Sequence, residues 1–214
     1  MTFILHGMAR SPRVRATLVA MIECGAPHRF EPMAIGDNRA AAHLARHPFG
    51  RVPVLEHGDF TLYETQAILR YVARLHPAAA LTPSDPRHAA RMDQIIAIVD
   101  NYYVEAVTGG IARARLLAAM RGVAPDEAAI AAAVPMARLC WDVFDGLLGG
   151  DAFIAGPAHT LADIMLAPQV AVLARTPEGM ALLGEHPKLA GWFERMRARP
   201  AMAATEPERL MQAA

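Results

Sequence analysis

Residues 46–71, RHPFGRVPVLEHGDFTLYETQAILRY, decide the fold of the first half of the chain. Two short apolar runs, 52–56 and 60–63, flank a turn that contains Gly58, a pattern typical of a β-hairpin. From Thr65 onward the apolar residues recur at the spacing of one buried helical face. This stretch therefore predicts two antiparallel strands followed at once by a helix.

The Val52-Pro53 step is the most informative part of this stretch. A proline that opens a strand needs no ladder donor, and an X-Pro bond is the one peptide bond that can be cis at modest cost. If this bond is cis, the amide and carbonyl of Val52 face outward, where an extended peptide can pair with them. At Glu64 and Thr65 a helix N-terminus offers free N–H groups and positive dipole, which suit a carboxylate. Together these features predict a site for a small acidic peptide.

The preceding residues predict a strand over 2–6, a helix that begins at Ser11-Pro12, a strand over 29–34 and a short helix over 40–46. Serine at the cap with proline at the first helical position is a strong start signal. The resulting order, β-α-β-α-β-β-α, predicts a mixed sheet with helices on both faces.

The pattern becomes helical after a segment, 76–86, that carries three prolines. Helices are predicted over 87–121, bent at Gly109-Gly110, and over 126–148, 160–174 and 187–199. The third of these opens with a capping box in which Asp163 replaces the usual glutamate. We therefore predict an α/β domain over 1–77, a linker over 78–86 and an all-helical domain over 87–214.

Composition narrows the function. The 214 residues are 54% apolar and have a formal net charge of zero, which argues against a nucleic-acid partner bound through phosphate contacts. No apolar run has membrane-spanning length, and the N-terminus lacks a signal-peptide pattern. Cys24 and Cys140 are far apart and predict reduced thiols in a cytoplasmic protein. His43 and His47 have metal-binding spacing, but no acidic third ligand is near, so no metal is predicted.

Several segments, in their order and spacing, resemble the cytosolic glutathione transferase family. They are SPRVR at 11–15, HPFGRVPVL at 47–55, ETQAI at 64–68, the capping segment 160–163 and the closing helix 186–200. The resemblance covers nearly the whole chain and is closest to classes with a serine near the start of the first helix, such as phi, theta and many bacterial members. It implies a thioredoxin-like N-terminal domain, a C-terminal helical bundle domain and a homodimeric detoxification enzyme that joins glutathione to a hydrophobic electrophile.

The resemblance also implies roles for individual residues. Ser11, which caps the first helix, would donate to the glutathione sulfur as the catalytic residue. A thiol of pKa ~8.5 needs a shift of ~2 units, worth ~2.7 kcal/mol, to be mostly thiolate at pH 7, and one hydrogen bond to a charged group contributes ~1.5–3 kcal/mol. The remaining glutathione contacts would come from the Val52-Pro53 edge, from Glu64 for the α-ammonium, from Thr65 for its carboxylate, and from Asn38 and Arg39 for the glycine carboxylate. Arg51 replaces the glutamine that many relatives have before the Val-Pro step, and it either adds a carboxylate contact or alters peptide selectivity.

The sequence gives the weakest signal for the site that binds the electrophile. By resemblance it would lie between the loop before Ser11 and the long helix, and its candidates are Met8, Ala9, Arg10, Tyr102, Tyr103, Ala106 and Arg113. The tyrosines can equally pack in the core or at a dimer interface. Phe49 stands where some classes insert an aromatic key into the partner subunit, or it packs within its own domain. Isomerisation, dehalogenation, peroxide reduction and a non-catalytic binding role stay open as alternative functions.

Overall fold

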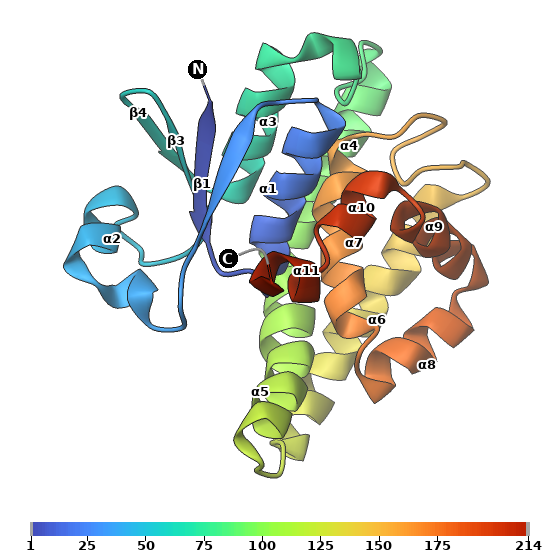
Figure 1. Cartoon of the computed structure of the whole chain (residues 1–214). Coiled ribbons are helices and arrows are strands. Elements are labelled where there is room, and N and C mark those ends of the chain that lie inside the picture. The colour runs from blue at the N-terminus through green and yellow to red at the C-terminus, as the bar shows by residue number, and fades with distance from the viewer. Residues whose placement is uncertain (1, 213–214) are drawn as a thin grey trace. The chain divides into compact units, whose positions relative to one another are not determined.

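The computed structural model describes residues 2–212. Contacts between these residues divide the chain into two compact units, one of residues 2–82 with 198–212 and the other of residues 83–197. The first unit contains the sheet and the second is all helical (Figure 1). The chain therefore returns to the first unit at its end, which the sequence did not predict. The domain boundaries at 77 and 87 stay predictions.

The sheet unit has four strands in the order β2-β1-β3-β4. The central strand β1 (Phe3–Gly7) is parallel to β2 (His28–Pro32) and antiparallel to β3 (Val54–His57), and β3 forms a hairpin with β4 (Phe60–Tyr63). Figure 1 shows α1 and α3 on one side of the sheet and α2 on the other. The predicted order of elements and the mixed sheet are confirmed. The helical elements of this unit are α1 (Pro12–Glu23), η1 (Asp37–Arg39), α2 (Ala41–Arg46), α3 (Thr65–Leu75), η2 (Pro77–Ala79), α10 (Pro200–Ala204) and α11 (Pro207–Gln212).

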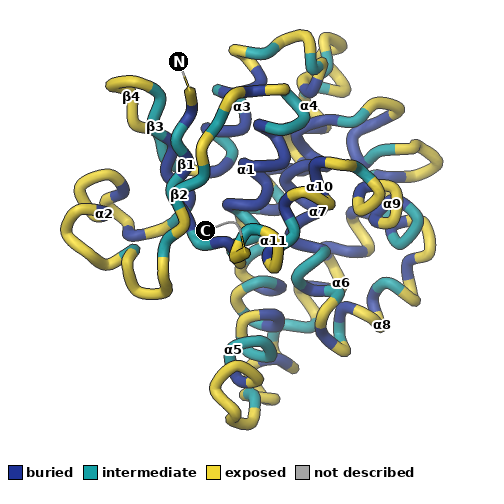
Figure 2. Tube along the Cα trace, viewed as in Figure 1, coloured by how far each residue is buried: buried dark blue, intermediate teal, exposed yellow. Residues whose placement is uncertain are grey.

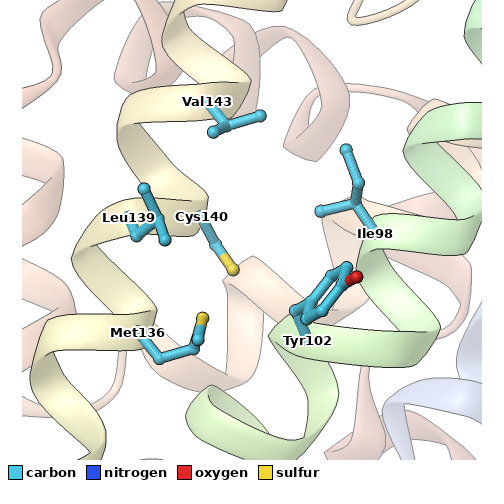
Figure 3. A pocket seen from close by; sticks show the side chains of 6 residues that line it. All are labelled: Ile98, Tyr102, Met136, Leu139, Cys140 and Val143. Atoms are coloured by element: carbon cyan, nitrogen blue, oxygen red, sulfur yellow. The ribbon is translucent and has the colours of Figure 1, made fainter.

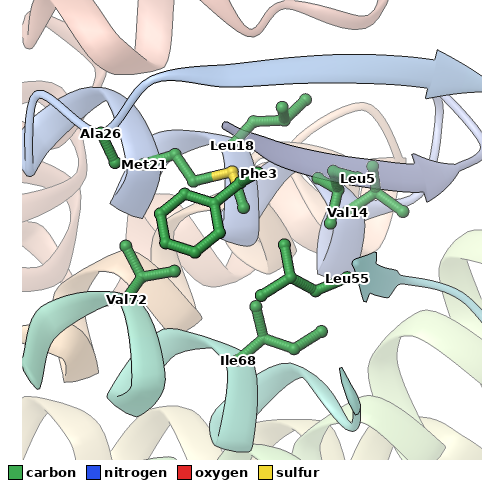
Figure 4. Packing of buried hydrophobic residues seen from close by; sticks show 9 residues of the cluster. All are labelled: Phe3, Leu5, Val14, Leu18, Met21, Ala26, Leu55, Ile68 and Val72. Carbon is green, nitrogen blue, oxygen red and sulfur yellow. The ribbon is translucent and has the colours of Figure 1, made fainter. Parts of the chain in front are cut away.

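The core of this unit lies between the sheet and the helices α1 and α3. Alternate residues of β1 are buried, because successive side chains of a strand point to opposite faces. Figure 4 shows Phe3 and Leu5 of that strand meeting apolar side chains from both helices and from β3. The cluster consists of Phe3, Leu5, Val14, Leu18, Met21, Ala26, Leu55, Ile68 and Val72.

Buried Arg15 explains why the end of the chain packs in the sheet unit. Its guanidinium donates to the Met202 carbonyl at 2.9 Å and to Glu206 Oε1 at 2.6 Å. The Arg15 side chain is almost fully buried, and a buried cation without such partners would be strongly destabilising. Arg199 adds two bonds to the Glu23 carboxylate of α1. These pairs join residues nearly 200 positions apart, so no local sequence pattern predicts them.

The helical unit is built from α4 (Pro86–Ile98), η3 (Val99–Ala112), α5 (Arg113–Arg121), α6 (Glu127–Leu148), α7 (Leu161–Leu173), α8 (Pro177–Glu185) and α9 (Pro187–Arg197). Residues 86–121 are helical throughout, as predicted, but residues 99–112 wind as a π-helix. π-Helical turns are rare and are often found at functional sites. Helix α7 is buried along nearly its whole length and forms the centre of the unit (Figure 2).

The predicted capping box at the start of α7 is present. Asp163 is fully buried and accepts from the amides of Ile154 and Thr160, both at 2.9 Å, and from the Trp192 indole N–H at 2.8 Å. One carboxylate thus joins the loop before α7 to α9, and all of its contacts are hydrogen bonds from neutral donors. Among residues 2–212, no helix is long and apolar enough to cross a membrane.

Candidate functional site

One end of the sheet gathers the segments that carry the predicted site. In the register of the strands, His6 pairs with Val54, Val54 pairs with Tyr63, and Gly7 pairs with Pro32. The end of β1, the start of β3, the end of β4 and the end of β2 therefore lie side by side. The Val52-Pro53 and Glu64-Thr65 steps adjoin these strand ends directly, and Ser11 and the η1 turn follow them within five residues, so the register brings all four toward the same edge of the unit.

Ser11 is the N-cap of α1, as predicted. Its Oγ accepts from the Val14 amide at 3.4 Å, a long bond, and its side chain is only partly buried. The hydroxyl proton is not used in this contact, because the oxygen acts as the acceptor. Ser11 can therefore cap the helix and at the same time donate to a group at the surface.

The Val52-Pro53 peptide bond is cis. Pro53 is buried, whereas Val52 lies outside the ladder between β1 and β3, whose pairs begin at Val54. The strand expected over 52–56 therefore starts two residues later. This leaves Val52 as main chain at the edge of the sheet end rather than as part of the sheet.

Glu64 and Thr65 form the entry to α3. Glu64 has a φ of 72°, which a residue with a side chain rarely adopts and which marks local strain. Thr65 is 1% exposed, and its hydroxyl has no hydrogen-bond partner in the described chain. The first helical bond runs from the Ile68 amide to the Glu64 carbonyl, so the amides of residues 65–67 precede it. A buried hydroxyl without a partner beside free helix amides is a donor set that fits a carboxylate.

The residues predicted for the glycine end have different surroundings. Asn38 donates its amide to the Gly50 carbonyl at 2.7 Å, so it holds the loop that leads to Val52. Arg39 and Arg51 are exposed, and the guanidinium of Arg39 lies against Gly50. Two cations near the Val52 edge give this side of the site the charge that a carboxylate requires.

The candidates for the electrophile site fall in both units. In the sheet unit, Met8 is partly buried, Ala9 is 9% exposed, and Arg10 is exposed with its Nε 3.4 Å from the Met211 sulfur of α11. In the helical unit, Ala106 is buried and Arg113 is exposed. Tyr103 is completely buried and packs on Phe144, which favours the packing alternative. Burial raises the pKa of the Tyr103 hydroxyl far above its usual range.

Tyr102 instead lines an open apolar pocket of about 280 Å³ in the helical unit. Figure 3 shows Ile98 and Tyr102 on one helix facing side chains of α6, with the Cys140 sulfur directed between them. The α6 residues of the pocket are Met136, Leu139, Cys140 and Val143. The sequence analysis missed them, although their spacing of three and four residues defines an apolar stripe on an otherwise exposed helix face.

Comparison with known proteins identifies the family to which this fold belongs. The model of the glutathione S-transferase N-terminal domain matches residues 1–74, and that of the C-terminal domain matches residues 127–195. Glutathione S-transferase 4 of Zea mays is 32% identical over 199 residues, which are 92% of this chain and 88% of the maize protein. The chain belongs to the glutathione S-transferase family. The predicted resemblance and the fold class are thereby confirmed.

Solved structures of this family have the same arrangement of elements. Glutathione transferase F7 of Populus trichocarpa matches with a TM-score of 0.88 at 25% identity, covering 97% of this chain and 99% of that chain. Glutathione S-transferase I from maize, in complex with an atrazine glutathione conjugate, matches with a TM-score of 0.85 at 25% identity over 99% of both chains. The Glu64-Thr65 and Val52-Pro53 steps therefore belong to the N-terminal domain of a glutathione S-transferase fold.

Proposed function

We propose that this protein is a glutathione transferase that joins the glutathione thiolate to a hydrophobic electrophile. The observation that carries the proposal is Thr65, whose buried hydroxyl has no partner beside the strained Glu64 at the start of α3. In the proposed complex, Thr65 and the helix amides hold the γ-glutamyl carboxylate, and Glu64 pairs with its ammonium group. Val52 pairs with the peptide main chain, and Arg39 and Arg51 lie toward the glycine carboxylate.

Ser11 is the proposed catalytic residue. Its hydroxyl donates to the bound sulfur and favours the thiolate over the thiol, which lowers the thiol pKa. The sulfur lone pair then attacks the electrophilic carbon, a carbon–sulfur bond forms, and the leaving group departs with the bonding electrons. No covalent enzyme intermediate is needed, because the site contributes positioning and anion stabilisation. Met8, Ala9 and Arg10, directly before Ser11, are the proposed electrophile contacts of the sheet unit; Tyr102, Ala106 and Arg113 stay predictions.

The test is conjugation of glutathione to chlorodinitrobenzene by wild type and by Ser11→Ala. We expect the variant to bind glutathione with nearly unchanged affinity, to lose about 10- to 100-fold in turnover, and to show a higher pKa for the bound thiol. Loss of the cap also costs about 1 kcal/mol of stability, so unfolding is measured in parallel. The exposed Ser84→Ala serves as the control. Unchanged turnover in Ser11→Ala leaves Ser11 as a helix cap only.

The same assay distinguishes the alternative functions. A wild-type protein that binds glutathione but conjugates no electrophile, while it isomerises, dehalogenates or reduces peroxides, selects one of the other reactions of the same thiolate. A protein without glutathione-binding heat in a calorimetric titration, but with a tight protein partner, is a non-catalytic member.

We also propose a homodimer in which Phe49 of each subunit enters the apolar pocket between Ile98, Tyr102 and α6 of the other. Phe49 is a large apolar side chain with 66% of its surface exposed, and the pocket is lined by apolar side chains. Phe49→Ala is expected to shift the protein toward monomer in analytical ultracentrifugation. Ile35→Ala, at another exposed apolar side chain of the same unit, leaves the dimer intact. A Phe49→Ala protein that sediments like wild type rules out this contact.

The cysteines support a cytoplasmic location. Cys24 and Cys140 are free thiols, and burial raises the pKa of each to about 11, helped at Cys24 by the neighbouring Glu23. Both thiols are therefore protonated and weakly nucleophilic at neutral pH.

A detoxification role follows from the proposed reaction, because the charged peptide makes an apolar electrophile water-soluble.

A further inference from the structure

The buried residue of helix α2 is a histidine. Of its six residues, His43 alone is buried, with 3% of its surface exposed. A helix of this length is not stable in isolation, so its position depends on the contacts that this imidazole makes. The apolar Leu44 is less covered, with 36% of its surface exposed and one methyl group directed at Gly50.

His43 connects α2 to the loop that leads to the Val52 edge. Its Nε2 lies 2.7 Å from the Arg51 carbonyl oxygen, and because that oxygen can only accept, Nε2 carries the proton. Asn38 donates to the preceding carbonyl, that of Gly50, at 2.7 Å. The main chain immediately before Val52 is thus fixed by two side-chain donors. The Nδ1 atom of His43 is buried and has no partner in the described chain.

His47, one turn further, connects α2 to the Glu64-Thr65 step. Its ring stacks on that of His43 at 6.1 Å between centroids and on that of Tyr63 at 4.6 Å. Tyr63 is the last residue of β4 and directly precedes Glu64. Phe49 packs edge-on against both His47 and Tyr63. A stack of three rings therefore runs from the Arg51 carbonyl to the start of α3, through side chains that are buried at His43 and His47.

We propose that His43 and His47 are positioning residues that hold the Val52 edge and the Glu64-Thr65 step at the spacing that glutathione requires. The inference rests on the proposed function, since it assumes that glutathione spans both segments. Neither residue needs to touch the ligand. Each acts through another group, His43 through the Arg51 carbonyl and His47 through the Tyr63 ring.

A dependence on pH follows from the surroundings of His47. Burial lowers its pKa; Glu64 opposes this effect, and His43 and Arg51 add to it. The imidazole is therefore neutral at pH 7, and a proton on it would be buried while facing two groups of positive or potentially positive charge. Opening the stack restores an ordinary pKa of about 6.5, so acid favours the open arrangement. The stacked arrangement of the rings is therefore fully stabilised above the ordinary pKa, and this stabilisation is lost as the pH falls through the lowered pKa of His47.

Other charged groups on and near α2 have partners away from the two histidine rings. Arg46 of α2 pairs with Glu56 of β3 at 2.8 Å, and the same carboxylate pairs with His6 of β1. On η1, Asp37 accepts from the Ala34 amide. The groups that act on or contact the ring of His47 are Arg51 of the loop, Glu64 at the start of α3 and Tyr63 of β4. Arg39 of η1 lies against Gly50 of the same loop.

The first experiment separates positioning from general stability by steady-state kinetics. In His47→Ala and His43→Ala we expect the KM for glutathione to rise about 3- to 10-fold with kcat within about twofold of wild type. His43→Gln, which keeps a donor for the Arg51 carbonyl, and His47→Phe, which keeps a stacked ring, are expected to restore KM. His57→Ala is the matched control: its ring packs on Phe3 and bonds to Tyr71 at the other end of the sheet, so it lowers stability without changing KM.

The second experiment titrates each protein calorimetrically with S-methylglutathione, which has no ionisable thiol, at pH 7.0 and 5.5. One coupled proton changes affinity by at most tenfold per pH unit, and we expect wild type to bind about tenfold more weakly at pH 5.5, with His47→Phe within about twofold. Normal wild-type binding with an unchanged KM in both alanine variants, or an equal pH effect in His47→Phe, overturns this inference alone. A wild-type protein that binds no S-methylglutathione at either pH overturns the proposed function and this inference together.

Discussion

Replacing Thr65 by valine should move stability and glutathione affinity in opposite directions. The Thr65 hydroxyl is buried and has no hydrogen-bond partner, and such a group costs about 1–3 kcal/mol when it is left unsatisfied. Valine has the same shape and nearly the same helix propensity, so Thr65→Val removes this cost without leaving a cavity. We expect the free energy of unfolding to rise by about 1 kcal/mol.

In the complex the same hydroxyl meets a carboxylate, and a hydrogen bond to a charged group contributes about 1.5–3 kcal/mol. The affinity of Thr65→Val for glutathione should therefore fall about 10- to 150-fold. Urea unfolding and calorimetric titration measure the two quantities. Thr17→Val is the control, because Thr17 is equally buried but donates to the Arg13 carbonyl at 3.2 Å. Its affinity should not change. A Thr65→Val protein that is less stable than wild type, or that binds glutathione equally well, would refute the assignment.

Three further predictions concern the structure around the site and in the helical unit. Asp163→Ala leaves the donors of Ile154, Thr160 and Trp192 unpaired in the core and should lower the free energy of unfolding by at least about 4 kcal/mol, measured in urea; a loss below about 1 kcal/mol contradicts the reading. At His186, burial lowers the pKa, but hydrogen bonds to Asp142 and to the Leu182 carbonyl outweigh it and leave the pKa raised. The stabilisation is therefore complete below the unfolded pKa of about 6.5 and is lost as pH rises through the higher folded value, so Asp142→Asn should flatten the fall in stability between pH 6 and 8; an unchanged slope sinks the idea. Gly50 has a φ of 58°, and a Cβ there would lie 2.9 Å from the Asn38 carbonyl oxygen, so Gly50→Ala should raise the KM for glutathione as well as cost about 1–2 kcal/mol. Gly25→Ala, with a similar φ of 61° and open space around it, should cost stability alone, and equal KM values in both variants count against the role of this loop.

The sheet unit could be predicted closely because its signals are local. The alternation in 52–63, the turn at Gly58 and the cap at Ser11 each act within a few residues of chain, and the register of the strands then brings the distant site segments together. The strand at Val52 was predicted two residues too early, because apolar character does not show where ladder pairing starts. The return of residues 198–212 was missed because it depends on Arg15, a charge that local patterning places at the surface.

The all-helical character of the second unit was predicted, but its details were not. Apolar periodicity predicted the helical stretches over 87–121, 126–148, 160–174 and 187–199, but it missed α8 (Pro177–Glu185) and contains no signal for π-helical winding. The same limit applies to the tyrosine pair. Tyr102 and Tyr103 are adjacent in sequence, yet one lines an open pocket and the other is completely buried, and only the winding of the helix decides which is which.

The buried polar groups of the two units differ in their surroundings. The Asp163 carboxylate accepts hydrogen bonds from the donors around it and stabilises the packing of the helical unit. Thr65 Oγ1 and the Nδ1 atoms of His43 and His47 are unsatisfied, and all three lie around the single sheet end where a strained Glu64 and two exposed arginines also gather. A missing partner alone does not mark a site, because the Tyr103 hydroxyl in the helical core lacks one too. The difference is that the groups at the sheet end adjoin free helix amides and exposed arginines. A ligand that carries both an anion and a peptide main chain can therefore bond there to the groups that the folded chain leaves without partners.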